Sequence, residues 1–134
     1  MKIRSDYVSN SSSTSFIIAY KQDAKLRLGN SKTYFTMNDF VDMIDRMTRS
    51  WSSDDTQLVA SGEENVIDHE KDRIYDDSDK EFVEGLRKFI NEQKRKKGME
   101  FVTIRISYHD KFIRMMYDAF KESKKLIEFN EQEE

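Results

Sequence analysis

Residues 101–108 read Phe-Val-Thr-Ile-Arg-Ile-Ser-Tyr, and the fold prediction depends on this stretch. From Val102 to Tyr108 the even-numbered side chains are apolar or aromatic and the odd-numbered ones are polar, which is the two-residue period of a strand. A strand of this kind has one face in the core and one in solvent, so we expect helices on one side of the sheet only. Residues 15–20 (Ser-Phe-Ile-Ile-Ala-Tyr) are apolar on both faces and predict a central strand.

Further strands and three helices surround these two stretches. Short strands are predicted at 57–61 and 125–129, with a weaker one at 2–8. Apolar residues at helical spacing predict helices over 37–50, from 78 to about 97, and from 110 onward. Thr36 with Asp39, and Ser78 with Glu81, have the spacing of N-terminal caps, and Gly98 is expected to close the second helix.

The alternation of strands and helices predicts an α/β fold. We expect a two-layer sandwich, with three helices on one face of a four- to five-stranded mixed sheet and right-handed crossovers between neighbouring parallel strands. A three-layer flavodoxin-like arrangement is the alternative. The chain is expected to form a single domain over 1–134, with a long loop over 61–77 and a frayed acidic tail at 130–134.

Composition narrows the classes of protein. The 134 residues include no cysteine, which excludes disulfides and thiolate zinc sites, and 37% are charged. No apolar run approaches the roughly 18 residues that a membrane span needs, and the start lacks an apolar signal-peptide region. We therefore expect a cytoplasmic protein with no membrane association.

The charges are distributed unevenly along the chain. Residues 51–84 contain twelve Asp/Glu against three Lys/Arg, whereas the segments on either side each carry a net charge of +3. Such a block creates a negative potential that attracts basic partners, and tryptophan is enriched at binding hot spots. The predicted partner-binding residues are Trp51, Asp54, Asp55, Glu63, Glu64, Asp68, Glu70, Asp72, Tyr75, Asp76, Asp77 and Asp79.

The N-terminal residues 4–18 (Arg-Ser-Asp-Tyr-Val-Ser-Asn-Ser-Ser-Ser-Thr-Ser-Phe-Ile-Ile) form a distinctive string. It resembles the opening of many small uncharacterised proteins of bacteriophages and low-GC Gram-positive bacteria, in which an aromatic-Val-Ser-Asn step leads into a serine run and Phe-Ile. The resemblance implies a phage origin and transfers no activity. Its hydroxyls also suggest a candidate anion site, formed by Arg4, Ser11, Ser12, Ser13 and Ser15.

Other chemistries find little support in the sequence. His69 and the nearby aspartates do not have the spacing of an EF-hand loop, so no metal site is predicted. His109 and Asp110 suit a surface capping pair, and no Gly-x-Ser-x-Gly nucleophile elbow occurs. The basic run 94–97 complements a helix C-terminus, so direct nucleic-acid binding is not expected. We expect no cofactor and no catalysis.

These observations predict a small, non-enzymatic, phage-encoded interaction protein. It is expected to bind a host protein, of a kind that itself binds nucleic acid, through the acidic surface, and to act as a host-takeover or anti-defence inhibitor in the host cytoplasm. One alternative is a phosphate-ligand-binding or enzymatic α/β domain that uses the serine-rich loop. Another is a virion component or other homo-oligomeric structural protein.

Overall fold

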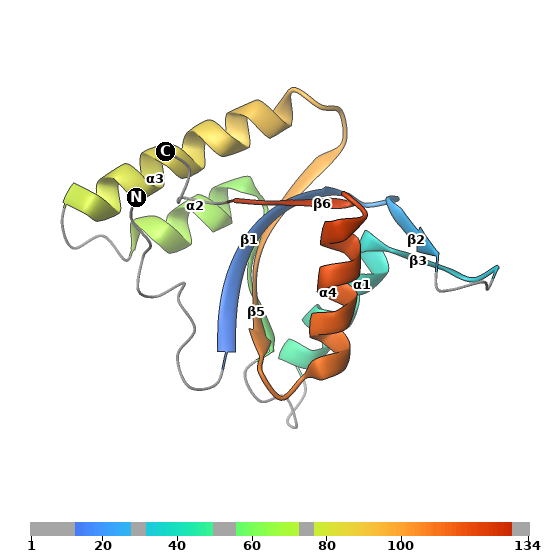
Figure 1. Ribbon diagram of the computed structural model, residues 1–134. Helices are drawn as coiled ribbons and strands as arrows, with labels where there is room; N and C mark the ends of the chain where they lie inside the picture. The colour runs from blue at the N-terminus through green and yellow to red at the C-terminus, as the bar shows by residue number, and fades with distance from the viewer. Residues whose placement is uncertain (1–12, 28–31, 50–55, 73–76, 130–134) are drawn as a thin grey trace.

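The computed structural model describes residues 13–27, 32–49, 56–72 and 77–129 (Figure 1). Ten helices and strands lie within these ranges. In chain order they are β1 (Ser13–Lys21), β2 (Lys25–Arg27), β3 (Tyr34–Thr36), α1 (Met37–Thr48), β4 (Gln57–Ser61), α2 (Glu63–Lys71), α3 (Asp77–Lys94), β5 (Met99–Ser107), α4 (Lys111–Glu122) and β6 (Leu126–Glu128).

The main sheet has four strands in the order β4-β5-β1-β6, and every neighbouring pair is antiparallel. Strands β1 and β5 pair over nine residues, from Ser13 opposite Ser107 to Lys21 opposite Met99. The short strands β2 and β3 form a separate hairpin between β1 and α1.

The α/β class is confirmed, but the expected parallel neighbours are not present in the sheet. Helix α1 connects β1 to β4, and α4 connects β5 to β6. Each of these helices joins two strands of the same direction, as alternation predicts, because both strands are antiparallel to a third strand that lies between them. Without the β2–β3 hairpin and helices α2 and α3, the order is β-α-β-β-α-β with split β-α-β units, the topology of ferredoxin-like domains.

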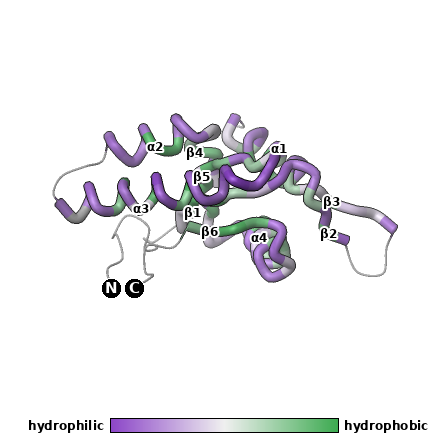
Figure 2. The backbone as a smooth tube through the Cα atoms, turned by 90° about the horizontal axis from the view of Figure 1, so that it is seen from above, coloured by the Kyte–Doolittle hydropathy of each residue, from purple (hydrophilic) through white to green (hydrophobic). Residues whose placement is uncertain are grey.

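Helices cover both faces of the sheet, and this corrects the prediction of helices on one face. Figure 2 shows α2 and α3 on one side of the strands, with α1 and α4 on the other. Two separate cores result because successive strand residues point to opposite faces: Ile18 contributes to the core under α1 and α4, and Ile17 to the core under α2 and α3. Strand β5 is therefore not half-exposed, and Thr103 is 1% exposed.

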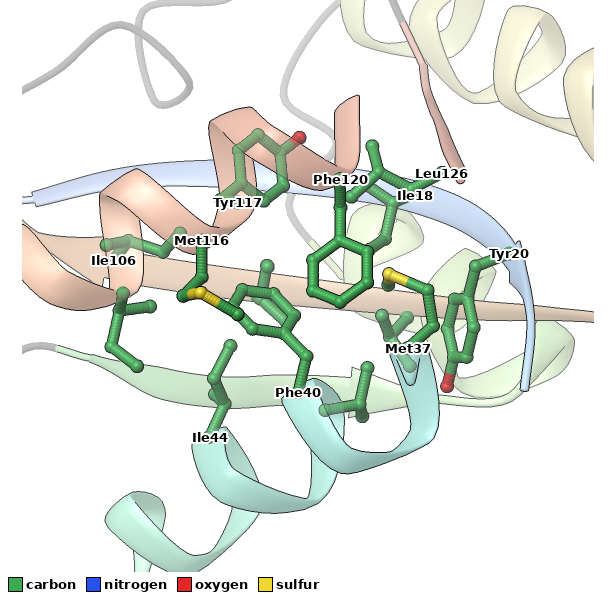
Figure 3. Close-up of a cluster of buried hydrophobic side chains, with 14 residues drawn as sticks. Ile18, Tyr20, Met37, Phe40, Ile44, Ile106, Met116, Tyr117, Phe120 and Leu126 are labelled. Atoms are coloured by element: carbon green, nitrogen blue, oxygen red, sulfur yellow. The ribbon is translucent and has the colours of Figure 1, made fainter. Parts of the chain in front are cut away.

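Aromatic side chains from α1 and α4 meet in the larger core (Figure 3). The Phe40 ring centroid lies 5.4 Å from that of Phe120 and 6.5 Å from that of Tyr117. Phe40 and Phe120 are fully buried. Burial of each such ring contributes about 1.5–3 kcal/mol, so these two helices are held on the sheet mainly by apolar packing.

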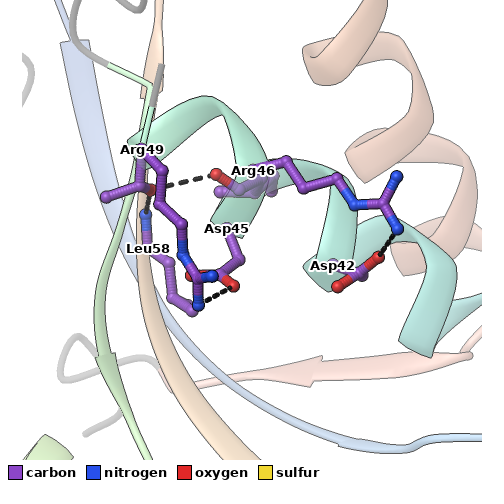
Figure 4. A network of polar contacts seen from close by, with 7 residues as sticks. Asp42, Asp45, Arg46, Arg49 and Leu58 are labelled. Atoms are coloured by element: carbon purple, nitrogen blue, oxygen red, sulfur yellow. Dashed lines mark hydrogen bonds and ion pairs between the residues drawn. The ribbon is translucent and has the colours of Figure 1, made fainter. Parts of the chain in front are cut away.

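Polar contacts fix the ends of α1. Thr36 and Asp39 form the predicted capping box, with reciprocal bonds of 3.0 and 3.1 Å between backbone N–H groups and side-chain oxygens. At the other end the Thr48 hydroxyl donates to the Ile44 carbonyl and accepts from the Leu58 N–H, which ties α1 to β4 (Figure 4). Two Asp–Arg pairs spaced by four residues, Asp42 with Arg46 and Asp45 with Arg49, flank this contact.

Three local predictions need correction or completion. Residues 63–71, expected as part of a long loop, form α2. Helix α3 begins at Asp77, so Ser78 lies inside the helix rather than at its cap. Helix α3 ends at Lys94, so Gly98 does not close it as predicted; Gly98 lies in the turn before β5, with a φ of 81° that glycine adopts readily. The predicted strand at 2–8 and the tail at 130–134 fall outside the described residues.

Candidate interaction surface

The exposed face of α2 is mainly acidic, with Lys71 among its acids. Val66, Ile67 and the fully buried Glu70 face the sheet. Glu64, Asp68 and Asp72 are exposed, and because they are spaced by four residues they lie one above another on the opposite face.

The first half of α3 continues this acidic face. Asp77, Glu81 and Glu84 are exposed and lie three or four residues apart, while Phe82 and Leu86 are buried against the sheet. Within the described residues Asp77 pairs with Lys80 at 3.9 Å, and the two side chains are 98% and 66% exposed. Such an exposed pair contributes little to stability and neutralises little of the local field.

Helices α2 and α3 lie side by side and run in opposite directions (Figure 1). An ion pair of 3.0 Å between Glu63 and Lys94 joins the start of α2 to the end of α3. The end of α2 and the start of α3 are therefore neighbours, joined by residues 73–76, which lie outside the described residues. We call this region the acidic end, and define it as Asp68, Asp72, Asp77, Glu81 and Glu84.

The structure divides the predicted partner-binding residues into groups. Glu64, Asp68, Asp72 and Asp77 are exposed on the two helices. Glu63 is paired with Lys94, and Asp79 is half-buried on the sheet-facing side of the first turn of α3. The rest of the predicted set falls outside the described residues: Trp51, Asp54, Asp55, Tyr75 and Asp76.

Glu70 does not belong to the exposed surface, because it is 0% exposed. It follows Val66 by four residues and Ile67 by three, so it shares their buried face. Two exposed acids were missing from the predicted set, Glu81 and Glu84. Glu81 and Glu84 follow Asp77 by four and seven residues, so helical spacing puts all three on the face of α3 opposite its apolar side chains. This spacing could have identified them from the sequence.

The candidate anion site is described only in part. Arg4, Ser11 and Ser12, and the side chain of Ser13, fall outside the described residues. Ser15 lies within β1, and its partner across the sheet is Arg105 of β5. The described serine of this group is therefore part of a paired strand.

Asp110 has the predicted capping role at the start of α4. Its Oδ1 accepts a hydrogen bond of 3.3 Å from the Ile113 N–H, and its Oδ2 accepts one of 3.2 Å from the Thr56 hydroxyl. The His109 side chain is exposed, and the backbone N–H of His109 donates a hydrogen bond to the Ser107 hydroxyl oxygen. Within the described ranges, no three His, Cys, Asp or Glu side chains are grouped so as to hold a metal ion.

None of the helices in the described part of the chain is long and apolar enough to cross a membrane. Compared with known proteins, the chain matches no family model, no curated protein and no solved structure. The ferredoxin-like topology does not supply a function either, because one fold hosts many unrelated activities. The function of the chain must therefore be inferred from its surface.

Proposed function

We propose that this chain is a non-catalytic interaction protein whose acidic end binds a basic surface of a partner protein. The observation that carries the proposal is the placement of exposed carboxylates on the outer faces of two adjacent helices. The field of these carboxylates attracts a basic partner and raises the rate of encounter, most strongly at low salt.

The spacing of these acids has a cost that binding would explain. Glu64, Asp68 and Asp72 are like charges four residues apart, and so are Asp77 and Glu81. Each such pair destabilises an isolated helix by about 0.2–0.5 kcal/mol. Neutral polar residues at these positions would keep the fold without this repulsion, so the carboxylates favour a role beyond solubility.

The resemblance of residues 4–18 to the opening of bacteriophage and low-GC Gram-positive proteins supports a phage origin, and a host protein is then the expected partner. A host protein that binds nucleic acid has the required chemistry, because its basic groove is built to face phosphates. The proposed mechanism is occlusion: the acidic end occupies the groove and excludes the nucleic acid.

The test compares host proteins captured from a bacterial lysate by the tagged chain and by a variant. The variant carries Asp68→Asn, Asp72→Asn and Glu81→Gln, which removes three charges from the acidic end. We expect the wild-type chain to retain basic nucleic-acid-binding proteins that dissociate as salt is raised, because exposed charges are screened over about 10 Å at 0.1 M salt. We expect the variant to lose at least tenfold in recovery.

A matched control carries Asp42→Asn, Glu92→Gln and Glu100→Gln, three exposed acids outside the acidic end. It has the same net charge as the test variant, so it should retain the same proteins as the wild type. Thermal unfolding should show the test variant to be as stable as the wild type or more so, since like-charge repulsion is relieved. Equal recovery by the test variant and the wild type would overturn the proposal.

A further inference from the structure

The outer face of α4 exposes apolar side chains, away from the acidic end. Phe112 is 54% exposed and Met115 is 60% exposed, and they are two of the three large hydrophobic residues exposed to this extent in the described ranges. A surface hollow runs along the same face, lined in part by Met115 and Ala119. Adjacent exposed apolar side chains rimmed by charges are typical of a protein–protein contact.

The charges on this face are ordered against the helix dipole. Lys111 is the first residue of α4 and Glu122 is the last, and both side chains are exposed. A helix is stabilised by acids at its start and bases at its end, so each of these side chains is at the less favourable end. The face therefore has a basic first half and an acidic second half.

Arg114 has unused hydrogen-bonding capacity beside this hollow. Its guanidinium carbon lies 5.1 Å from the centre of the Tyr108 ring. Its Nη1 atom is buried and has no hydrogen-bond partner among the described residues. Four residues along the helix, Asp118 lines the same hollow and is exposed. Arg114 also lines this hollow, so a carboxylate of a partner seated there would lie beside its positive charge.

We propose that the outer face of α4 binds a second copy of this chain, with the two α4 helices antiparallel about a two-fold axis. A two-fold contact needs a self-complementary surface, and a basic first half that meets an acidic second half provides one. In the antiparallel arrangement Lys111 lies opposite Glu122 of the second copy, and the reverse pair forms at the other end. Arg114 then comes within one turn of Asp118 of the second copy.

The apolar side chains fit the same arrangement. Met115 lies close to the two-fold axis and packs on the second copy of α4. Phe112 lies on one flank of the helix, within one turn of Ala119 of the second copy, whose small side chain leaves room for the ring. The middle of the helix pair thus combines Met115 with Arg114 and Asp118, and the Lys111–Glu122 pairs lie at its two ends.

The experiment exchanges charges at the two ends of the helix. Lys111→Glu and Glu122→Lys are made as separate single variants, and the mass in solution is followed by sedimentation over a range of concentrations. We expect the wild-type chain to form a dimer. Each single variant brings like charges together at both ends of the pair, so its dimer dissociation constant should rise at least tenfold.

Mixing the two single variants provides the decisive measurement. In a mixed dimer both ends have opposite charges again, so the mixture should form dimers with an affinity close to that of the wild type. Each substitution also improves the match with the helix dipole, so thermal unfolding of either variant should show no loss of stability. The proposal is overturned if the wild type stays monomeric, if the single variants dimerise as the wild type does, or if mixing restores nothing.

Discussion

At the scale of single residues, two buried phenols couple stability to alkaline pH. Tyr117 is 2% exposed and donates a hydrogen bond of 2.5 Å to Oε2 of Glu128. Burial, and then the charge of Glu128, raise the pKa of Tyr117 far above its usual value. The neutral phenol is the form that the fold requires, because a phenolate at this point would be desolvated beside a carboxylate.

Tyr20 gives a pH prediction with a defined range. Burial in the core, and then the charge of Glu100, raise the pKa of Tyr20 from 10.0 to about 12. Above pH 10 the unfolded chain releases the phenolic proton while the folded chain still holds it, so the unfolded state is favoured as pH rises. The stabilising contribution is complete below pH 10 and is lost as the pH rises from 10 to 12.

Tyr20→Phe removes this proton, so the variant should lose less stability than the wild type between pH 9 and pH 11.5. Urea unfolding followed by circular dichroism at both pH values measures the difference. Tyr34→Phe is the control, because Tyr34 is 46% exposed, and it should follow the wild type. The same alkaline loss in Tyr20→Phe as in the wild type would contradict the assignment.

At the scale of elements, Asp110 joins three parts of the fold. It caps α4 and accepts a hydrogen bond from Thr56, the residue before β4. The Thr56 hydroxyl oxygen in turn accepts from the buried Ser107 N–H at the end of β5. One carboxylate therefore fixes the start of α4 relative to two strands.

Asp110→Ala should lower the free energy of unfolding by about 2 kcal/mol, since it removes both the cap and a partly buried hydrogen bond. Asp110→Asn should lose less, because the amide oxygen can still accept from the Ile113 N–H. Asp42→Ala, at an exposed position within α1, should change stability by less than about 0.5 kcal/mol. Urea unfolding measures all three, and a cost for Asp110→Ala no larger than that for Asp42→Ala would refute the role of the cap.

The elements also show why sequence patterns predicted some parts of the fold and missed others. Helices α1 and α4 have regular apolar stripes, and the strand at Gln57–Ser61 was predicted with its observed bounds. Helix α2 has only two apolar residues in nine, and its N-cap is Gly62, which offers no capping side chain. Its pattern therefore does not stand out from that of an acidic loop.

Two wrong predictions have separate causes. Thr103 and Arg105 were assigned to a solvent-facing side of β5 because they are polar, and helices were therefore expected on the other face only, whereas α2 and α3 cover this one. Glu70 was placed on the surface because helical spacing was not applied to residues 63–71. The exposed acids themselves were largely predictable from composition, whereas the antiparallel order of the sheet depends on long-range pairing that local patterns do not contain.

At the scale of the whole molecule, the two proposed surfaces are independent. The acidic end belongs to the α2–α3 layer, and α4 lies on the opposite face of the sheet (Figure 2). A dimer formed through α4 therefore leaves both acidic ends pointing outward. Such a dimer has two binding surfaces, and a partner array with matching spacing would bind it more tightly than it binds one chain.

This geometry predicts which positions of two copies can be linked covalently. The chain contains no cysteine, so a single introduced thiol can react only with its counterpart in another copy. Residue 115 lies near the proposed two-fold axis. Packed helices bring the two Cα atoms there to about 4.4–6.8 Å apart, the separation that a disulfide needs, so we introduce Met115→Cys. Mild oxidation should convert most of this variant into a linked dimer, as measured by non-reducing electrophoresis.

Lys71→Cys is the matched comparison. Lys71 is exposed on α2, which belongs to the helix layer that faces away from the proposed dimer contact. It should show no covalent dimer on the same gel after the same oxidation. Adding Lys111→Glu to Met115→Cys should abolish linkage, since the thiol is unchanged and only the charge pairing is lost. Linkage of Lys71→Cys as fast as that of Met115→Cys would mean random collision, and linkage that survives Lys111→Glu would mean that charge does not orient the two helices.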